Sequence, residues 1–300
     1  MILRTLEELP QIIGTHQPDM LVVALLGKCT PLTWRVLLGT QAQGVRIEDD
    51  RTLYEKLTKR VLVHPEYTHG FPLCRRHPWR EAAKRLTDML LSAVSLCVVL
   101  PCMALIALFI KLDSRGPVFF HQDRVGKDGR TFTLTKFRTM VPDAEKHSGP
   151  VWAQEDDPRI TRMGHLLRRT GFDELPQLWS IFKGDMSLVG PRPERPYFVA
   201  QLTEQLPGYA QRLSVRPGLT GWAQVSYGYG ASVEDAQTKL GFDLYYIKHR
   251  SFWLDLWIML CTVPKVLGAH VTLRASAPTS TLTLDTLTLD MPQTGGTLYH

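Results

Sequence analysis

Hydrophobic and polar positions divide the chain into segments with different periods. The longest apolar run, Met89–Ile110, carries no charged residue over 22 positions. A run of this length is typical of a helix that enters a lipid bilayer, whereas a buried core helix usually shows a polar face. Closer to the start, residues 20–26 form a short continuous apolar run that is typical of a buried parallel strand.

Beyond the long apolar run, the period of the pattern changes twice. Residues 118–125 and 131–137 alternate between apolar and polar positions around GKDGR, which predicts a β-hairpin with an Asp-Gly turn. Apolar stripes at helical spacing then predict further helices, with Asp173 as the N-cap of one of them. These predicted helices cover residues 159–169, 173–182, 202–215 and 251–267. The last of them keeps Asp255, which favours a core or interfacial helix over a second membrane span.

The residues before the apolar run predict a small α/β unit. Helical and strand patterns alternate over residues 1–70, as in half of a doubly wound domain. The GxGxxG fingerprint is absent, so nucleotide binding is unsupported here and a regulatory or oligomerising role is favoured. Proline, histidine and glycine cluster from His64 to Pro78, which is typical of a linker. The threonine- and leucine-rich tail, residues 269–300, is expected to be disordered.

Charge and cysteine content narrow the class of protein. The net charge is +6 and the isoelectric point about 9.1, but no basic stripe with interleaved aromatic residues is present, so nucleic acid is not an expected partner. A membrane surface or a small anionic substrate fits this charge better. The five cysteines show no CxxC or Cys/His spacing, which predicts neither disulfides nor a zinc site and fits a reducing, cytosolic compartment. No cleavable signal peptide is recognised at Met1.

The flanks of the apolar run predict how it meets the membrane. Basic residues lie on both sides, and such residues mark the cytoplasmic side of a membrane segment. Pro101, near the middle, removes a backbone hydrogen bond and bends a helix. A re-entrant hairpin that enters and leaves through the cytoplasmic leaflet satisfies both observations, and a straight span is the alternative. The flanking basic residues are Arg75, Arg76, Arg80, Lys84 and Arg85 before the run and Lys111, Arg115, Arg124 and Lys127 after it.

The strongest candidate for chemistry is the stretch RRTGFDELPQLWSIFKGDMSLVGPRP, residues 168–193. It places the adjacent carboxylates of Asp173 and Glu174 between Arg168 and Arg192, and adjacent like charges cost stability unless a cation or a phosphate relieves them. Cations around a carboxylate favour a nucleophile that acts on a polyanion, whereas a simple N-cap is the alternative interpretation of Asp173. Arg192 lies between two prolines, where a rigid guanidinium suits a diphosphate.

Two further cations and one metal ion are candidates for the same site. Lys136 and Arg138 bracket Phe137, where they would either contact phosphate or be ordinary strand-edge charges. Phosphoryl transfer from a diphosphate generally uses Mg²⁺. Because magnesium takes only one or two protein carboxylates, Asp173 is a sufficient candidate ligand and no dense acidic cluster is required. No P-loop is present, which argues against ATP as the substrate.

Short motifs follow one another in a fixed order from Lys84 to Leu267. They are KRxxD at 84–88, SRGPVFF at 114–120, RVGxxGxxF at 124–132, KFRTM at 136–140, DPRITRMG at 157–164, LLRRTGFDELPQLW at 166–179, GDMSLVGPRP at 184–193 and PGLTGWAQV at 217–225. In this order they resemble the bacterial sugar transferase family, the monotopic polyprenyl-phosphate phosphoglycosyl transferases. So many ordered motifs make a chance resemblance implausible.

The resemblance implies a site and a reaction. It makes Asp173 the nucleophile that attacks the β-phosphate of a UDP-sugar, Glu174 its partner in a catalytic dyad, and Arg168 a phosphate contact. The other phosphate-binding candidates are Lys136, Arg138 and Arg192. The reaction would place a sugar-1-phosphate on polyprenyl (undecaprenyl) phosphate and release UMP, which begins exopolysaccharide, capsule or O-antigen synthesis. The resemblance also implies Mg²⁺ and a membrane helix bent at a proline, here Pro101.

Two departures from the family pattern concern the bend and the dyad. The best-known bend in the family is Ser-Pro, whereas this chain has Leu100-Pro101, and Gly171 stands where many members have serine. Residues 1–70 resemble only the latter part of the Rossmann-like module of larger members. These features motivate an alternative, a catalytically inactive membrane-bound scaffold or regulator of polysaccharide assembly. The intact dyad argues against it, because an inactive descendant has no reason to keep adjacent carboxylates.

The predicted architecture is α/β or α+β and membrane-associated. It comprises a partial Rossmann-like (CoA-binding-like) module at 1–70, a linker at 71–83, a re-entrant membrane helix at 84–113, a mainly helical cytosolic catalytic domain with a small β-hairpin at 114–268, and a tail at 269–300. The catalytic domain is expected on the cytoplasmic face of the bacterial inner membrane. Expected partners are a UDP-sugar, polyprenyl phosphate and membrane lipid, with a homo-oligomer and downstream glycosyltransferases as further candidates. The sequence leaves the identity of the sugar open.

Overall fold

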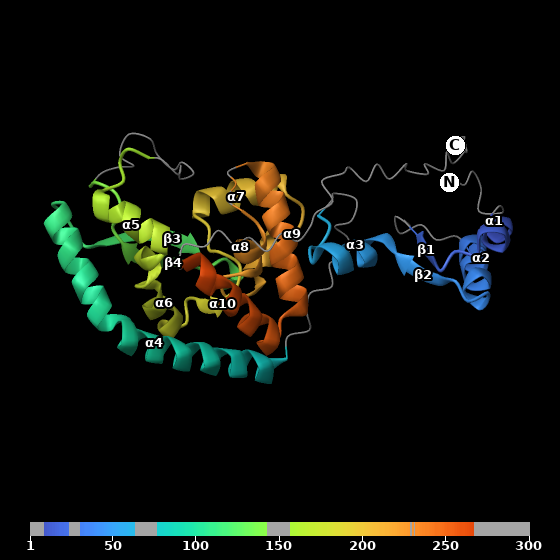
Figure 1. Ribbon diagram of the computed structural model, residues 1–300, viewed down its shortest axis with the longest axis horizontal. Helices are drawn as coiled ribbons and strands as arrows, with labels where there is room; N and C mark the ends of the chain where they lie inside the picture. The colour runs from blue at the N-terminus through green and yellow to red at the C-terminus, as the bar shows by residue number, and fades with distance from the viewer. Residues whose placement is uncertain are drawn as a thin grey trace, which may run out of the picture. The chain divides into compact units, whose positions relative to one another are not determined.

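The chain divides into two compact units in a computed structural model that describes residues 9–23, 31–63, 77–142, 157–228, 230 and 232–266 (Figure 1). The first unit is Met1–Thr58 with Ser276–His300, and the second is Lys59–Ala275. The predicted tail, residues 269–300, lies outside the described residues, as does the part of the predicted linker at 71–76.

The described part of the first unit alternates helices and strands. Its elements are α1 (Leu9–His16), β1 (Met20–Val23), α2 (Pro31–Ala42), β2 (Arg46–Asp49) and α3 (Asp50–Thr58). All of β1 pairs in parallel with β2, from Met20 opposite Arg46 onward. Leu9, Ile13 and Val45 form a small buried core beside the sheet. The predicted order of helix, strand, helix and strand is confirmed for these residues.

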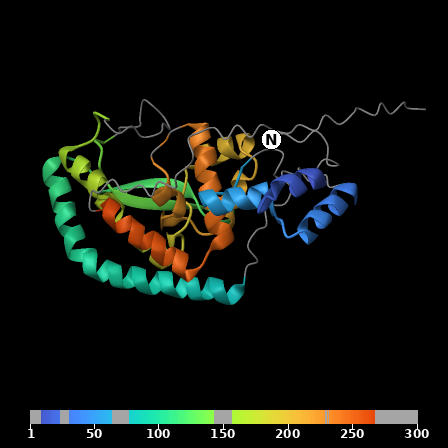
Figure 2. The same ribbon diagram turned by 45° about the vertical axis from the view of Figure 1, so that its right-hand side comes forward.

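The second unit begins its regular structure with one long apolar helix, α4 (Pro78–Asp113), which has 36 residues. Among the described residues it is the one helix long and apolar enough to cross a membrane, and only 11% of its most apolar window is buried in the protein. A core helix of a soluble domain would be mostly buried, so this helix is consistent with membrane association. Figures 1 and 2 show α4 bent, and Pro101 lies inside it, where a proline removes a backbone hydrogen bond.

One face of α4 packs on the rest of the second unit. Ile106 and Ile110 are buried in a cluster with Phe137 and Leu167. Many of the remaining apolar side chains of the helix are exposed: Leu86, Leu90, Leu91, Val94, Val98, Leu100, Leu105, Leu108, Phe109 and Leu112. The helix starts at Pro78, inside the range 71–83 that was predicted as a linker.

A β-hairpin follows α4, as the alternating pattern predicted. β3 (Phe119–Val125) pairs in antiparallel register with β4 (Thr131–Phe137) along the full length of both strands. Asp128 and Gly129 form the turn with φ values of 56° and 79°. Both values lie in the left-handed region, which explains the Asp-Gly sequence at this point.

Short elements and two longer helices complete the second unit. They are α5 (Arg162–Thr170), η4 (Phe172–Glu174), α6 (Gln177–Lys183), β5 (Ser187–Val189), α7 (Pro196–Gln205), η5 (Tyr209–Ser214), β6 (Gly218–Thr220), α8 (Trp222–Ser226), α9 (Val233–His249) and α10 (Phe252–Val266). β5 and β6 pair in parallel. The largest core cluster lies among α7, α9 and α10 and includes Phe198, Leu202, Leu240, Tyr246 and Ile258.

Two of the predicted helices have different outcomes in the structure. The single helix predicted over 202–215 is wrong, because α7 ends at Gln205 and the separate 3-10 helix η5 starts at Tyr209. Pro207 cannot continue a helix, and Gly208 adopts a φ of 76° between the two elements. The predicted last helix is confirmed as α10. Ile258 is buried on one of its faces, whereas Trp253 is 75% exposed on another.

Residues 59–63 belong to the second unit although they precede α4, and we call them the docking segment. The Val61 amide donates to the Gly241 carbonyl at 3.0 Å, and the Trp222 indole nitrogen donates to the Lys59 carbonyl at 2.9 Å. Gln237 Nε2 donates to the carbonyl of Val63, whose side chain is buried. The docking segment is therefore packed on α8 and α9.

Candidate active site

Asp173 and Glu174 lie in a short 3-10 turn, not at the start of an α-helix. α5 ends at Gly171, whose φ of 71° lies in the left-handed region that favours glycine, and η4 follows at once. Pro176 is the N-cap of α6 and provides no side-chain capping bond. The predicted N-cap role of Asp173 is therefore wrong. The rigid proline delays the start of the helix, so the Asp173 carboxylate is not used for capping.

Asp173 is a buried residue whose carboxylate has no direct partner in the described part of the chain. The residue is 8% exposed, and among the described residues no hydrogen bond or ion pair to its carboxylate is found. Burial and the neighbouring charge of Glu174 raise its pKa to about 6, while Lys136, Arg192 and Arg168 act in the opposite direction. At neutral pH this carboxylate is ionised but more basic than an ordinary aspartate.

Glu174, in contrast, is held by Arg192. Arg192 Nη2 lies 2.5 Å from Glu174 Oε1, and Nη1 lies 3.3 Å from Oε2, which is a two-pronged contact. Burial alone would raise the pKa of Glu174, but Arg192, Lys136 and Arg124 together lower it below its ordinary value. The Arg192 side chain remains 47% exposed, so its guanidinium also faces solvent. The two neighbouring carboxylates are therefore in different electrostatic states.

Two more of the predicted cations lie close enough to act on Asp173. Lys136, on β4, lies with Nζ 5.3 Å from the centre of the Phe120 ring, and burial lowers its pKa while the charge of Asp173 opposes that change. Arg168, on α5, donates from Nε to Thr139 Oγ1 at 3.0 Å. The structure thus brings Lys136, Arg168 and Arg192 together around the carboxylate pair.

Arg138 is directed to a different place. Its guanidinium donates to the carbonyl oxygens of Arg115 and Ser114 at 2.9 and 2.8 Å and to the Ser114 hydroxyl at 2.8 Å. These acceptors lie directly after the end of α4. Gly116, with a φ of 126°, provides the room, because a Cβ at that position would collide with the arginine. The contacts of Arg138 therefore fix the chain after α4, and its predicted phosphate contact stays a prediction.

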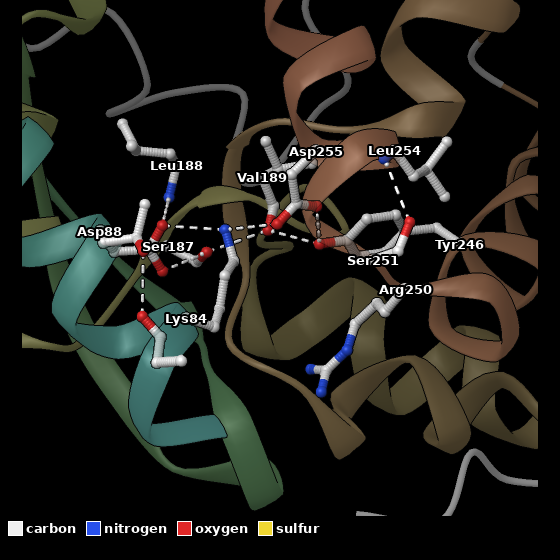
Figure 3. Close-up of polar contacts among 12 residues, drawn as sticks. Lys84, Asp88, Ser187, Leu188, Val189, Tyr246, Arg250, Ser251, Leu254 and Asp255 are labelled. Carbon is white, nitrogen blue, oxygen red and sulfur yellow. Dashed lines mark hydrogen bonds and ion pairs between the residues drawn. The ribbon is translucent and has the colours of Figure 1, made fainter. Parts of the chain in front are cut away.

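A second cluster of charges holds the start of α4, and we call it the anchor cluster (Figure 3). Lys84 Nζ lies 2.8 Å from Asp88 Oδ1 and 2.9 Å from Asp255 Oδ2. The Ser187 hydroxyl donates to Asp88 Oδ2 at 2.7 Å, and the Tyr246 hydroxyl donates to Asp255 Oδ1 at 2.8 Å. Asp88 and Asp255 are both buried, and each has a charged and a neutral partner. The cluster joins α4, β5, α9 and α10.

The KRxxD motif at 84–88 is explained by this cluster and by one further contact. Between Lys84 and Asp88, Arg85 donates to the carbonyl oxygens of Ile181 and Phe182, each at 2.6 Å. These carbonyls belong to the last turn of α6, where helix acceptors lack internal partners. The motif therefore fastens the long helix to the rest of the second unit.

Two arginines near the dyad, the partly buried Arg124 and the buried Arg212, were not assigned to the site from the sequence. Arg124 Nη1 donates to the Pro193 carbonyl at 2.9 Å, and Arg212 Nη2 donates to the Arg192 carbonyl at 2.8 Å. Burial lowers the pKa of Arg124 to about 10. Arg124 lies in the RVGxxGxxF motif, and this was the sequence signal that could have assigned it to the site. Arg212 lies outside all of the quoted motifs, so no signal in the sequence pointed to it.

The acidic residues of the site fit a single magnesium ion. Within the described residues, no group of three or more His, Cys, Asp and Glu could hold a metal ion alone. Magnesium does not need such a group, because it is commonly bound by one or two carboxylates together with substrate phosphates. Arg192 occupies the Glu174 oxygens, whereas the Asp173 oxygens are not engaged by the described residues. Asp173 is therefore the residue at this site whose chemistry suits Mg²⁺.

The chain belongs to the bacterial sugar transferase family. The family model matches residues 79–269, which include the long helix, both strands of the hairpin and the dyad. This match confirms the resemblance inferred from the ordered motifs.

Curated relatives of this chain carry related names. A UDP-N-acetylgalactosamine-undecaprenyl-phosphate N-acetylgalactosaminephosphotransferase of Aeromonas hydrophila is 42% identical over 256 residues, which cover 85% of this chain and 60% of the relative. A UDP-glucose:undecaprenyl-phosphate glucose-1-phosphate transferase of Caulobacter vibrioides is 43% identical, with coverage of 61% and 69%. An Escherichia coli protein with the same name is 41% identical, with coverage of 61% and 39%.

The extent of these matches bears on the N-terminal unit. This chain spans about three fifths (60%) of the length of the Aeromonas relative. That match has 256 residues, whereas only 222 residues of this chain follow residue 78, so it reaches into the part before the family model. Some of the N-terminal sequence is therefore shared with that relative.

Proposed function

We propose that this protein transfers a sugar-1-phosphate from a UDP-sugar to polyprenyl (undecaprenyl) phosphate, and so begins the synthesis of an exopolysaccharide, capsule or O-antigen. The observation that carries the proposal is the unequal state of two adjacent carboxylates. Glu174 is paired with Arg192, whereas Asp173 is buried with a pKa raised to about 6. The names of the relatives supply the class of donor and acceptor.

The proposed reaction has two displacement steps at one phosphorus atom. In the first, an Asp173 carboxylate oxygen attacks the β-phosphorus of the UDP-sugar and forms a covalent phosphosugar. The bond from this phosphorus to the bridging oxygen breaks, and the bridging oxygen leaves with the bonding electrons as part of UMP. In the second step, a phosphate oxygen of the lipid attacks the same phosphorus. The bond to Asp173 then breaks, which restores the carboxylate and yields the lipid diphosphate sugar.

The charges around Asp173 suit a nucleophile of this kind. Burial and the negative charge of Glu174 raise the pKa of Asp173, which makes the carboxylate more basic and a better nucleophile. Lys136, Arg168 and Arg192 limit this rise and keep the group ionised near neutral pH. The same cations would neutralise the two phosphates of the donor, which is the main requirement of phosphoryl transfer.

We propose Mg²⁺ as the cofactor of this site. Asp173 would hold it together with the substrate phosphates, and the ion would neutralise charge on the diphosphate. Treatment with EDTA is expected to abolish UMP release, and added Mg²⁺ is expected to restore it. Full activity in EDTA would contradict the proposed cofactor.

The membrane side of the proposal concerns α4. We propose that it is a re-entrant helix bent at Pro101, with both ends in the cytosol and the active site on the cytoplasmic face of the bacterial inner membrane. A helix of 36 residues is about 54 Å long, whereas a straight crossing needs only about 20 residues. The exposed apolar side chains, the internal proline and the basic residues at both ends support this topology.

Cysteine labelling in intact cells tests the topology. Single cysteines would be placed before Lys84 and after Arg115 in a cysteine-free background. A membrane-impermeant reagent is expected to leave both unlabelled until the cells are opened. Labelling of the first probe from outside while the second stays protected would show a straight span.

UMP release tests the reaction itself. Detergent-purified protein would be mixed with undecaprenyl phosphate, Mg²⁺ and each of several UDP-sugars, and UMP would be measured. At least one donor is expected to release UMP in the wild type, and Asp173→Asn is expected to release none above background. Asp185→Asn is a matched control, because Asp185 forms a partly exposed surface pair with Lys183. Full activity of Asp173→Asn would rule out the aspartyl intermediate.

For the N-terminal unit we propose a partial Rossmann-like module with a regulatory or oligomerising role. Its two parallel strands and flanking helices support this proposal. Homo-oligomer formation and association with downstream glycosyltransferases are the corresponding partner proposals. Mass measurement of the purified full chain and of a variant with Leu38→Asp, an exposed apolar position of α2, would test the oligomer: a homo-oligomer in the wild type supports it, and a monomer contradicts it.

A further inference from the structure

We propose that Arg212, held by Asp243 and Tyr209, is a positioning residue for the reaction: it fixes the loop that presents Arg192 to Glu174. This inference rests on the proposed function. Arg192 is joined to the dyad through its side chain, and the accuracy of that contact depends on where its backbone lies. The contacts that fix this backbone come from parts of the chain far from the dyad in sequence.

The backbone of the loop at 190–194 is bonded at every step. The Gly190 amide donates to the Thr220 carbonyl at 2.9 Å. Four consecutive carbonyls then accept hydrogen bonds from four different groups. The pairs are Pro191 with the Gly218 amide, Arg192 with Arg212, Pro193 with Arg124 and Glu194 with the Val125 amide. The two prolines have fixed φ angles, so little freedom remains in the loop.

Arg212 makes the contact closest to the functional side chain, because its acceptor is the carbonyl of Arg192 itself. Three of its nitrogens are engaged. Nη2 donates to the Arg192 carbonyl at 2.8 Å and lies 2.9 Å from Asp243 Oδ2. Nε donates to Asp243 Oδ2 as well, at 3.1 Å. Nη1 donates to the Tyr209 hydroxyl at 2.7 Å. Arg212 is 8% exposed and Asp243 is 2% exposed. The guanidinium is therefore locked in one orientation.

The burial of this pair argues for a geometric role. A buried ion pair is weak evidence for stability, because apolar residues of similar size often stabilise a core equally well. The Arg212–Asp243 pair instead links α9 and η5 to one carbonyl of the loop beside the dyad. Among the described residues, Arg212 forms no hydrogen bond or ion pair with Asp173 or Glu174. We therefore infer that it acts through Arg192. A displacement of Arg192 by about 1 Å can cost on the order of 100-fold in rate.

A double-mutant cycle separates positioning from general stability. Arg212→Lys keeps the charge but loses the fork that binds three partners. In the wild-type background it is expected to lower kcat for UMP release by about 10-fold to 100-fold. An Arg192→Gln background has no guanidinium at this position for Arg212 to orient. In that background Arg212→Lys is expected to lower kcat by less than about 3-fold. Equal losses in both backgrounds would overturn the proposal.

Two further variants protect the test against misfolding. Tyr209→Phe removes only one hydroxyl contact of Arg212 and is expected to show a smaller loss with the same dependence on Arg192. Arg85→Lys is a matched control, because Arg85 also donates to two backbone carbonyls, but at the end of α6. Its effect is expected to be the same in both backgrounds.

Hydrogen–deuterium exchange of the purified protein tests the loop without using the reaction. Arg212→Lys is expected to increase exchange in a peptide covering residues 187–194, and Arg85→Lys is expected to leave that peptide unchanged. Unchanged protection in Arg212→Lys would overturn the proposal even if the enzyme is active. If the wild type released UMP from no donor, the proposed function would fail, and the exchange result would still decide whether Arg212 fixes the loop.

Discussion

The dyad and the anchor cluster contain similar groups in opposite states. Each has two carboxylates with cations nearby, and in each the carboxylates are largely buried. In the anchor cluster, Asp88 and Asp255 each accept from Lys84 and from a hydroxyl group. In the dyad, Arg192 satisfies Glu174 alone and Asp173 keeps a pKa raised to about 6. The two clusters are alike in charge and burial, and they differ in whether each carboxylate has a bonded partner.

The difference shows how one fold uses the same chemical groups for two purposes. A buried carboxylate whose oxygens are all bonded holds elements together, because breaking one contact leaves an uncompensated charge. A buried carboxylate without a partner costs stability, and proteins keep such groups where they act on a substrate. Substitutions in the two clusters should therefore separate activity from stability.

The largest expected effect is on catalysis at Asp173. Asp173→Asn should lower UMP release by at least about 1,000-fold, because the nucleophile is lost. The melting temperature should stay the same or rise, because the substitution removes a buried charge that has no hydrogen bond. Activity and thermal unfolding would be measured on the same detergent-purified sample. A marked fall in melting temperature would place Asp173 in the same class as the anchor cluster.

The next effect is on stability at Asp88. Asp88→Ala removes a partner from both Lys84 and Ser187, and because Lys84 keeps Asp255 it should lower the free energy of unfolding by about 2 to 3 kcal/mol. Activity per folded molecule should change little, which is the reverse of the result at Asp173. Denaturant unfolding followed by tryptophan fluorescence measures the first quantity. Asp185→Ala, at a surface pair, is the control and should cost less than about 0.5 kcal/mol.

A smaller effect is expected from pH. Attack needs the ionised form of Asp173, so kcat/KM should fall as pH drops through about 6, to roughly one tenth of its plateau one unit lower. Arg192→Gln removes a charge that lowers this pKa, so the acid limb should move to higher pH. The profile would be recorded at constant Mg²⁺ with a non-perturbing buffer series. A limb near pH 4 in the wild type would show that Asp173 titrates as an ordinary aspartate.

The smallest effect is expected from Tyr246→Phe. The hydroxyl oxygen lies 2.8 Å from Asp255 Oδ1, to which it donates, and 3.0 Å from the Val189 carbonyl oxygen, and Lys84 would still hold Asp255 after its removal. The free energy of unfolding should fall by about 1 to 2 kcal/mol, with activity unchanged. The same fluorescence assay measures it. A loss as large as that of Asp88→Ala would mean that Lys84 does not compensate for the missing hydroxyl.

The sequence predicted those features that depend on short-range order. The hairpin follows from its alternation and its Asp-Gly turn, and α4 follows from the length of its apolar run. Asp173 and Glu174 are consecutive in the chain, so their closeness could be predicted without knowledge of the tertiary structure. Arg192 was recognisable because two prolines restrict it. The ordered motifs were enough to identify the family.

Features that depend on tertiary contacts could not be predicted in the same way. Lys136 and Arg138 bracket Phe137, and the sequence offered the same two alternatives for both, a phosphate contact or a strand-edge charge. β4 ends at Phe137, however, and Arg138 turns to the chain after α4. The Ser187–Asp88 and Arg212–Asp243 contacts join residues 99 and 31 positions apart, which no local pattern reveals.

The docking segment has a practical consequence for anyone who shortens this protein. The family model begins at residue 79, but packing of the second unit begins at Lys59. A chain cut at residue 79 would leave the Trp222 indole N–H and the Gln237 side-chain amide without their acceptors and the pocket of Val63 empty. Each unpaired group costs about 1 to 3 kcal/mol if it stays buried. The domain to express is therefore longer than the region that the family model covers.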